Sequence, residues 1–306
     1  MDAALVLMRP VPRASRMEEV QAFRIRAAQP KDKRAVRALC ARIWSDDYVP
    51  DVFDEWVRDR RGRCWVAVEE GQVIGIAKLT LTGDHEAWLH GLRVDPRHHR
   101  KGVATALLAH RIDRARHLRA RVARLDTQED NTAVHRMMRR FGFRLREVDR
   151  YFERRARSVV APRRASRADL PAAARLAGRA LLQDPHFARE LDRSDIARAI
   201  REGRCVVAGP PSRPTAFAII VPQHKSFHGS RLSVRALGGS IRGVRELMAA
   251  LPGRAREEGL SRVGSSTPSQ FWPALRRAGY RGRWELKYIF ERRLRAQAGV
   301  SRATSS

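Results

Sequence analysis

The first half of the chain alternates short apolar runs, which suit strands, with longer stretches in which apolar residues recur at helical spacing. The plainest helical pattern covers 102–118, where Val103, Leu107 and Ile112 fall near one face. Glu70-Gly71 separates two apolar runs and predicts the tight turn of a hairpin. The predicted order is strand 23–26, helices 32–44 and 52–59, strands 64–69, 73–81 and 87–94, helix 102–118, strand 122–126, helix 131–140 and strand 143–152. This order predicts an α/β fold with a mixed sheet.

The pattern restarts in the second half, after a basic linker at 158–167. Three pairs of segments correspond: 30–32 with 168–170, 64–68 with 205–208, and 140–143 with 278–280. We therefore predict an internal repeat, with an unrelated α+β packing domain as the alternative for the second half. The predicted limits are a flexible N-terminus at 1–20, a first domain at 21–157, the linker, a second domain at 168–294 and a disordered tail at 295–306.

The most informative turn joins strand 87–94 to helix 102–118 through a basic segment that contains glycine. A helix that starts near Gly102 leaves its first amides without intrahelical partners, and its positive end suits a pyrophosphate. Gly102 lets phosphate oxygens approach the backbone, and Ala104 keeps the next turn small. The segment therefore has the pattern of a diphosphate cradle.

A second segment follows about thirty residues later, where Asn131 is placed to cap a helix and Gly142 to end it before Phe143. The two segments, in this order, resemble motifs A and B of the GCN5-related N-acetyltransferase (GNAT) superfamily. Motif A has a strand ending in apolar-x-Val, a Pro and an (Arg/Gln)-x-x-Gly-x-(Gly/Ala) loop, and His99 departs from it by replacing the Arg or Gln. Motif B has an Asn followed by Gly-Phe eleven and twelve residues later.

The resemblance implies a GNAT fold, in two tandem domains, and acetyl-CoA as the acyl-donor cosubstrate. It also implies cofactor-binding residues on both motifs: Leu92, Arg93, Val94, His99, Arg100, Lys101, Gly102, Val103, Ala104, Thr105, Asn131 and Met138. The second half runs from strand 231–237 through 238–240 into a helix without the Pro and the basic loop. We therefore expect a degenerate second domain that does not bind acetyl-CoA.

Acetyl transfer to an amine needs a proton acceptor, and His90 is the first candidate. Histidine titrates near about 6.5 and suits this role at neutral pH. Regular alternation places four residues on one strand face, namely Trp88, His90, Leu92 and Val94. A histidine satisfied in the core is the structural alternative. Glu86 is the second candidate base. GNAT enzymes commonly carry a Tyr acid seven residues after the motif B Asn; here that residue is Met138, which leaves water or another side chain such as Tyr151 to protonate the thiolate.

The acceptor should be selected by the first helices, where aromatic residues adjoin Asp46 and Asp47. These carboxylates could hold an ammonium group, or Asp46 could cap a helix. The segment 89–94 resembles arylalkylamine N-acetyltransferases, and the run around Trp56 resembles histidine N-acetyltransferases. This favours a small amine or amino acid as acceptor. The alternatives are a protein N-terminal or lysine acetyltransferase and a non-catalytic, CoA-responsive binding protein.

The amino-acid composition limits the classes of molecule that this protein is expected to bind. The formal net charge of +29 comes mainly from arginines spread along both halves, without the interleaved aromatic motif of RNA-binding modules. We therefore expect no nucleic-acid partner and no membrane partner, while a homodimer stays open. The three cysteines, Cys40, Cys64 and Cys205, are too scattered for a disulfide framework or a metal site. A cytoplasmic protein is expected, and Met17 is an alternative start to Met1.

Overall fold

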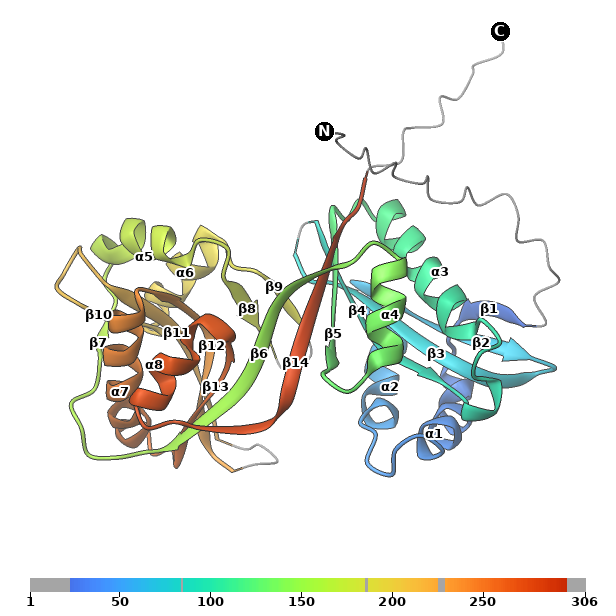
Figure 1. Cartoon of the computed structure of the whole chain (residues 1–306), viewed down its shortest axis with the longest axis horizontal. Helices are drawn as coiled ribbons and strands as arrows, with labels where there is room; N and C mark the ends of the chain where they lie inside the picture. The colour runs from blue at the N-terminus through green and yellow to red at the C-terminus, as the bar shows by residue number, and fades with distance from the viewer. Residues whose placement is uncertain (1–22, 84, 185–186, 225–228, 296–306) are drawn as a thin grey trace, which may run out of the picture. The chain divides into compact units, whose positions relative to one another are not determined.

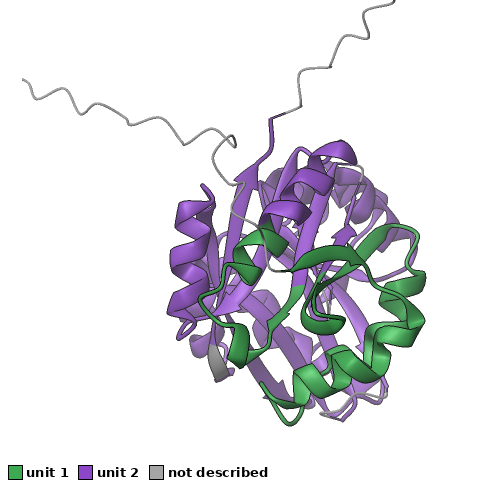
Figure 2. Ribbon diagram, turned by 90° about the vertical axis from the view of Figure 1, so that its right-hand side faces the viewer, with its two compact units in different colours: residues 1–77, 91–108 green, residues 78–90, 109–306 purple. Residues whose placement is uncertain are grey.

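The computed structural model describes residues 23–83, 85–184, 187–224 and 229–295. The predicted flexible N-terminus and, except for residue 295, the predicted tail lie outside the described residues. The chain forms two compact units (Figure 2). Unit 1 contains residues up to Ala77 together with Gly91–Leu108, and unit 2 contains Lys78–His90 together with Ala109 onward. Three elements contribute residues to both units: β3 (Gln72–Leu81), β4 (Glu86–Val94) and α3 (Val103–His117).

Unit 1 contains the first predicted strands and helices. Its other elements are β1 (Arg24–Ala27), η1 (Pro30–Asp32), α1 (Lys33–Ala41), α2 (Val49–Arg58), β2 (Gly62–Glu69) and η2 (Pro96–His98). Strand β1 is antiparallel to β2, and β2 neighbours β3. Glu70 and Gly71 have φ values of 47° and 80°, as a two-residue hairpin turn requires. The predicted hairpin is confirmed.

The core of unit 1 lies where α1 and α2 bury their apolar faces. Leu39 and Phe53, one from each helix, are fully buried and cluster with Val66 and Ile76 of the sheet. Burial of one such side chain stabilises the fold by about 1.5–3 kcal/mol. The segment 42–48 connects the two helices. It contains Asp47, which contacts Arg93 of β4 in the candidate site.

Unit 2 contains a sheet whose strands follow the order β4-β5-β14-β6-β13-β12-β11-β10-β7 (Figure 1). The strands added here are β5 (Val122–Gln128), β6 (Arg144–Arg155), β7 (Arg163–Arg164), β10 (Cys205–Ala208), β11 (Ala216–Gln223), β12 (Arg231–Gly239), β13 (Arg262–Pro268) and β14 (Arg281–Arg293). The pairs β4/β5 and β12/β13 are parallel. Pairing of β12 with β13 runs only to Val234 and Ser265, after which the two strands separate.

Helices cover both faces of β10–β12. They are α5 (Leu170–Ala177), α6 (Arg193–Arg201), α7 (Ile241–Glu257) and α8 (Trp272–Arg277); η3 (Arg167–Asp169), η4 (Ser269–Phe271), α4 (Thr132–Arg140) and the hairpin β8 (Leu181–Gln183) with β9 (Ala188–Glu190) complete the unit. Alternate residues of the strands enter two cores: Val206 and Ala218 pack with α7, while Val207 and Phe217 pack with α5 and α6. Because buried side chains alternate along these strands, the sheet is covered by helices on both faces and forms the middle one of three layers.

The last strands of the two halves are exchanged. By element order, β5-α4-β6 of the first half corresponds to β13-α8-β14 of the second. Strand β14 pairs with β5, and β6 pairs with β13, so each half completes its sheet with the final strand of the other (Figure 1). If the chain were cut within 158–167, β6 and its partner β13 would be on different fragments, and so would β14 and its partner β5.

Candidate functional site

Strand β4 ends in a turn that is shaped by Asp95. Its carboxylate is buried and accepts hydrogen bonds from the Arg97 amide (3.0 Å) and the Arg97 guanidinium (2.8 Å). Arg42, the residue after the end of α1, adds an ion pair of 2.8 Å. Hydrogen bonds from Arg97 lower the pKa of Asp95 well below its ordinary value, against the opposing effect of burial. Asp95 is thus the N-cap of η2, with Pro96 at the first helical position.

The start of α3 provides an open turn. Gly102 has a φ of 79°, and a Cβ at this position would meet no described atom within 4 Å. The first hydrogen bond of the helix joins Ala106 N to Gly102 O over 2.9 Å, so the amides of 103–105 have no intrahelical acceptor. These amides and the positive end of the helix fit a diphosphate.

The basic residues of the turn are partly neutralised. A ring nitrogen of His98 lies 2.8 Å from the carboxylate of Glu69, and Lys101 Nζ lies 3.9 Å from the same oxygen. A ring N–H of His99 donates to the carbonyl of Val94 over 3.2 Å. His99 therefore folds back on the end of β4, and Arg100, with a φ of 64°, continues the turn toward Gly102.

Gly91 interrupts the regular geometry of β4. Its φ is 66°, and a Cβ there would lie 2.4 Å from the indole of Trp56. Only glycine combines this conformation with such a close approach at no steric cost. The two-residue alternation that was used to place His90 and Leu92 on one face therefore cannot be carried across Gly91.

Beyond Gly91, the Arg93 side chain is fixed by Asp47. The guanidinium donates to the two carboxylate oxygens over 2.7 and 2.9 Å, and it lies 4.7 Å from the ring centroid of Trp44 and 5.6 Å from that of Tyr48. Asp47 also accepts from the Val49 amide over 3.1 Å at the start of α2. Asp47 is therefore engaged with Arg93 and with a helix end, which leaves the exposed Asp46 as the carboxylate of this segment that faces solvent.

His90 lies on the half of β4 that belongs to unit 2. Its Nε2 is 3.0 Å from the hydroxyl of Thr80 on β3. The buried guanidinium of Arg111 donates to the carbonyls of Lys78 and His90, each over 3.3 Å. Arg111 thus fixes the backbone of both strands at the position of His90.

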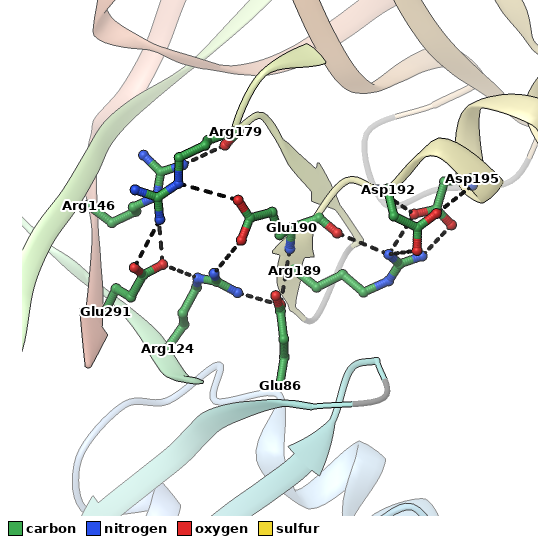
Figure 3. Close-up of polar contacts among 9 residues, drawn as sticks. All are labelled: Glu86, Arg124, Arg146, Arg179, Arg189, Glu190, Asp192, Asp195 and Glu291. Carbon is green, nitrogen blue, oxygen red and sulfur yellow. Dashed lines mark hydrogen bonds and ion pairs between the residues drawn. The ribbon is translucent and has the colours of Figure 1, made fainter. Parts of the chain in front are cut away.

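Glu86 belongs to a buried ion-pair network (Figure 3). Its carboxylate accepts hydrogen bonds from Arg124 of β5 and from the Glu190 amide, the latter over 3.0 Å. Arg124 is 1% exposed and also pairs with Glu291 (2.7 Å) and Glu190 (3.5 Å). The network joins β4, β5, β9 and β14, so the Glu86 carboxylate is already occupied by a cation and an amide.

The residues of motif B have the predicted backbone roles. Asn131 Oδ1 accepts from the Val134 amide over 3.3 Å and caps α4, and Gly142, with a φ of 70°, follows the end of that helix. Both predictions are confirmed. Met138 is 1% exposed. The Tyr151 hydroxyl accepts from Arg231 over 3.1 Å, on a strand three places from β4, or roughly 14 Å at the usual strand spacing.

The corresponding turn of the second half is closed. Ser240 Oγ accepts from the Gly243 amide over 3.0 Å and caps α7. A Cβ on Gly243 would lie 2.6 Å from Thr215 Oγ1, and Thr215 O accepts from the Ser240 amide over 2.9 Å. The segment before β11 therefore occupies the space at this helix start.

Comparison with known proteins agrees with this geometry. The sequence model of the acetyltransferase (GNAT) family matches residues 29–143. Residues 29–143 therefore carry a GNAT acetyltransferase domain. The GNAT family is one of acyltransferases that act on amines, and acetyl-CoA is its general acyl donor, so the match indicates an acyltransferase domain in this part of the chain. Among curated proteins, none matches the sequence.

Two solved structures extend the GNAT likeness along most of the chain. A GCN5-related N-acetyltransferase from Sphaerobacter thermophilus is 14% identical, with a TM-score of 0.60. The match covers 89% of this chain and 96% of the Sphaerobacter chain. A glucosamine N-acetyltransferase region of a fungal multi-domain β-N-acetylglucosaminidase is 16% identical with a TM-score of 0.62, covering 88% of this chain and 38% of its own. At these identities the likeness concerns the fold, and it confirms the predicted mixed α/β GNAT fold.

Several residues that shape the GNAT site were not predicted. Asp95 could have been recognised, because Asp followed by Pro is the usual start of a short helix. Arg111 and Arg124 have no local signal in the sequence, since their partners lie on distant strands.

None of the helices in the described part of the chain has the length and apolar character needed to cross a membrane. Within the same residues, His, Cys, Asp and Glu form no group suited to a metal ion.

Proposed function

We propose that this protein transfers the acetyl group of acetyl-CoA to a primary amine of a small molecule or amino acid, by direct attack in a ternary complex. The observation that carries the proposal is the open, left-handed Gly102 at the start of α3, on the turn that follows the His90 strand. That turn has room and free amides for a diphosphate, and the strand supplies a proton acceptor close by in sequence.

Acetyl-CoA would be held mainly by backbone groups. The amides of 102–105 suit its pyrophosphate, the basic residues Arg100 and Lys101 suit its phosphates, and the backbone of Leu92 and Val94 suits the pantetheine arm. His99, Arg93, Asn131 and Met138 would shape the surrounding walls. Support comes from the free helix amides at Gly102 and from the match of the GNAT model to this region.

In the reaction, the neutral amine nitrogen attacks the thioester carbonyl, the C–S bond breaks, and coenzyme A leaves as a thiolate. The proton lost by the nitrogen passes to His90, directly or through water. Positioning of the two substrates and polarisation of the carbonyl by backbone amides supply most of the acceleration. The hydroxyl of Thr80, 3.0 Å from Nε2, orients the imidazole.

Glu86 is better suited to positioning than to proton transfer, because Arg124 and the Glu190 amide occupy its carboxylate. The thiolate is protonated by water, since Met138 offers no acidic group and Tyr151 is bound to Arg231 on a distant strand. The lack of a dedicated acid also favours the alternative of a CoA-responsive binding protein without turnover.

The acceptor would meet the aromatic residues of the α1–α2 connection. Trp44 is 49% exposed and Tyr48 is 42% exposed, and both rings lie close to the Arg93 guanidinium. This surface suits a small aromatic or cationic amine. A protein N-terminus or lysine is the second candidate acceptor, favoured by the same exposure.

We also propose a cytoplasmic location, because the cysteines Cys40, Cys64 and Cys205 are free and buried.

The test is a turnover assay with acetyl-CoA that detects the free thiol and screens amino acids, aralkylamines, polyamines and peptides. Thiol release that depends on one class of small amine supports the proposal. Release only with peptides would assign the second candidate acceptor, and acetyl-CoA binding with no release for any class would assign the binding protein.

A further inference from the structure

A pocket lies in unit 2, where β12 and β13 separate beyond Val234 and Ser265. Its volume is about 430 Å³, within the range of small-molecule sites. It is lined by the end of β12, the end of α5, the β8 strand, the start of η4 and residues 146–147 of β6. The closed turn at Ser240 argues against a pyrophosphate here, so the ligand must be recognised by other groups.

Arg235 supplies a cation at this pocket. Its Nη1 donates to the backbone carbonyl of Gln183 over 3.4 Å, and none of the described carboxylates forms an ion pair with it. Burial lowers the pKa of Arg235, and the charge of Asp184 opposes that effect only in part. The other two arginines of the lining, Arg146 and Arg179, both pair with Glu291 (Figure 3). Arg235 is therefore the guanidinium best placed to receive an anion.

One carboxyl group of the lining supplies the opposite character. Glu147 lines the pocket, whereas Asp149, two residues later on β6, is fully buried and lies outside the lining. Asp149 accepts hydrogen bonds from the side-chain amide of Gln183 and from Ser266 (3.4 Å). Gln183, which also lines the pocket, therefore contacts Arg235 through its backbone carbonyl and Asp149 through its side-chain amide.

Burial, and next the charge of Asp149, raises the pKa of Glu147 to about 8, and burial raises that of Asp149 as well. The charged and polar groups that face this pair come from each neighbouring element: Arg146 on β6, Arg124 on β5, Lys287 on β14, Gln183 on β8 and Ser266 on β13. At neutral pH, Glu147 carries a proton that a bound cation would displace.

We propose that this pocket binds a free α-amino acid, with its carboxylate on Arg235 and its ammonium on Glu147. The paired opposite charges of such a ligand match the guanidinium and the carboxyl group that line the same pocket. The site is separate from the acetyl-CoA turn in sequence and chemistry, so the proposal does not depend on the proposed acetyl transfer. Its function would be to sense an amino acid.

The test is isothermal titration of the full chain, without acetyl-CoA, with L-phenylalanine, L-leucine, L-glutamate and L-arginine. The best binder is compared with its analogue lacking the ammonium and its analogue lacking the carboxylate. We expect both analogues and Arg235→Met to bind about 10- to 100-fold more weakly, the usual worth of a charged hydrogen bond. Arg242→Met on exposed α7 is the matched control and should bind as wild type.

Proton release gives an independent readout. Titrations at pH 7 in buffers of different ionisation enthalpy should show a proton released on binding, and the release should fall as the pH rises above about 8. Glu147→Gln resembles the protonated side chain, so it should fold normally but lose the release and most of the affinity. Gly102→Glu should retain amino-acid binding.

Equal affinity for the analogue without ammonium, or binding without proton release, would overturn the proposal. So would undiminished binding by Glu147→Gln and Arg235→Met, because the amino acid would then occupy another site. A failure of acetyl transfer with amino-acid binding intact would leave this inference standing.

Discussion

Arg93 and Asp47 join strand β4 to the start of α2 through two hydrogen bonds of 2.7 and 2.9 Å. The Asp47 side chain is 1% exposed and that of Arg93 is 13% exposed, so water screens the pair little. Burial alone would raise the pKa of Asp47, but the hydrogen bonds from Arg93 and Val49 outweigh it and the pKa lies below its ordinary value. The pair thus stabilises the connection that presents Trp44 and Tyr48.

Asp47→Asn should lower the free energy of unfolding by about 3 kcal/mol at pH 7, because it leaves the buried Arg93 without a counter-ion. Urea denaturation measures this, and Asp46→Asn at the exposed neighbouring position is the control. The folded-state pKa lies below the unfolded value of about 4, so the contribution of Asp47 is full above that pH and is lost as the pH falls through the folded-state pKa. The two proteins should therefore converge in acid; a constant difference at all pH values would contradict the ion-pair account.

Gly102→Glu should abolish acetyl-CoA binding, because it places an anion and a side chain at the helix start that we propose as the pyrophosphate site. Gly259 provides a matched control: its φ is 68°, close to the 79° of Gly102, and a Cβ at either position meets no described atom. Both substitutions to Glu should cost about 1 kcal/mol of backbone strain, seen as equal shifts in melting temperature. Loss of affinity in both, or in neither, would remove Gly102 from the cofactor site.

Each chain should bind one acetyl-CoA. Ser240 caps α7 by accepting from the Gly243 amide, and Thr215 occupies the space beside Gly243, so the corresponding turn of the second half has little room for a diphosphate. Calorimetry should give a stoichiometry of one, and Gly102→Glu should reduce it to zero. A residual site in that variant, weakened by Ser240→Glu, would show that the second half also binds the cosubstrate.

The order of elements could be predicted because it depends on local signals. The hairpin at Glu70-Gly71, the cap at Asn131 and the helix end at Gly142 each follow from one or two residues with a specific backbone preference. The boundaries of most predicted strands and helices agree with the structure to within a few residues. The repeat of this order in the second half predicted a second set of similar elements for the same reason.

The pairing of those elements could not be predicted. The exchange of β6 and β14 depends on contacts between residues more than a hundred positions apart, such as Phe290 with Leu125. Likewise, no local pattern indicates that Arg124 would meet Glu86 and Glu291, or that Gly91 would break the alternation of β4. The catalytic and cofactor-binding roles of His90 and of the residues around Gly102 stay predictions.

Glu86→Gln separates a positioning role from proton transfer. Removal of this carboxylate leaves Arg124 with Glu190 and Glu291, so we expect a loss of stability of about 1–3 kcal/mol. The rate per folded molecule should change by less than about tenfold, with the same pH dependence as wild type. Melting curves and steady-state rates on one preparation measure both quantities, and a pH profile that flattens would instead assign the base to Glu86.

His90→Gln should lower turnover by about 10²–10⁴-fold, the usual contribution of a positioned proton acceptor, with acetyl-CoA affinity nearly unchanged because the turn at Gly102 is intact. The wild-type rate should rise with pH as the imidazole loses its proton, and this rise should be absent in the variant. Thr80→Val removes the hydroxyl 3.0 Å from Nε2 and, by leaving the imidazole less well oriented, should lower the rate while keeping its rise with pH. His117→Gln, at the end of α3, controls for the loss of a histidine. If His90 served only the core, His90→Gln would melt at a lower temperature and each folded molecule would turn over at the wild-type rate at every pH, so that bulk water would be the proton acceptor.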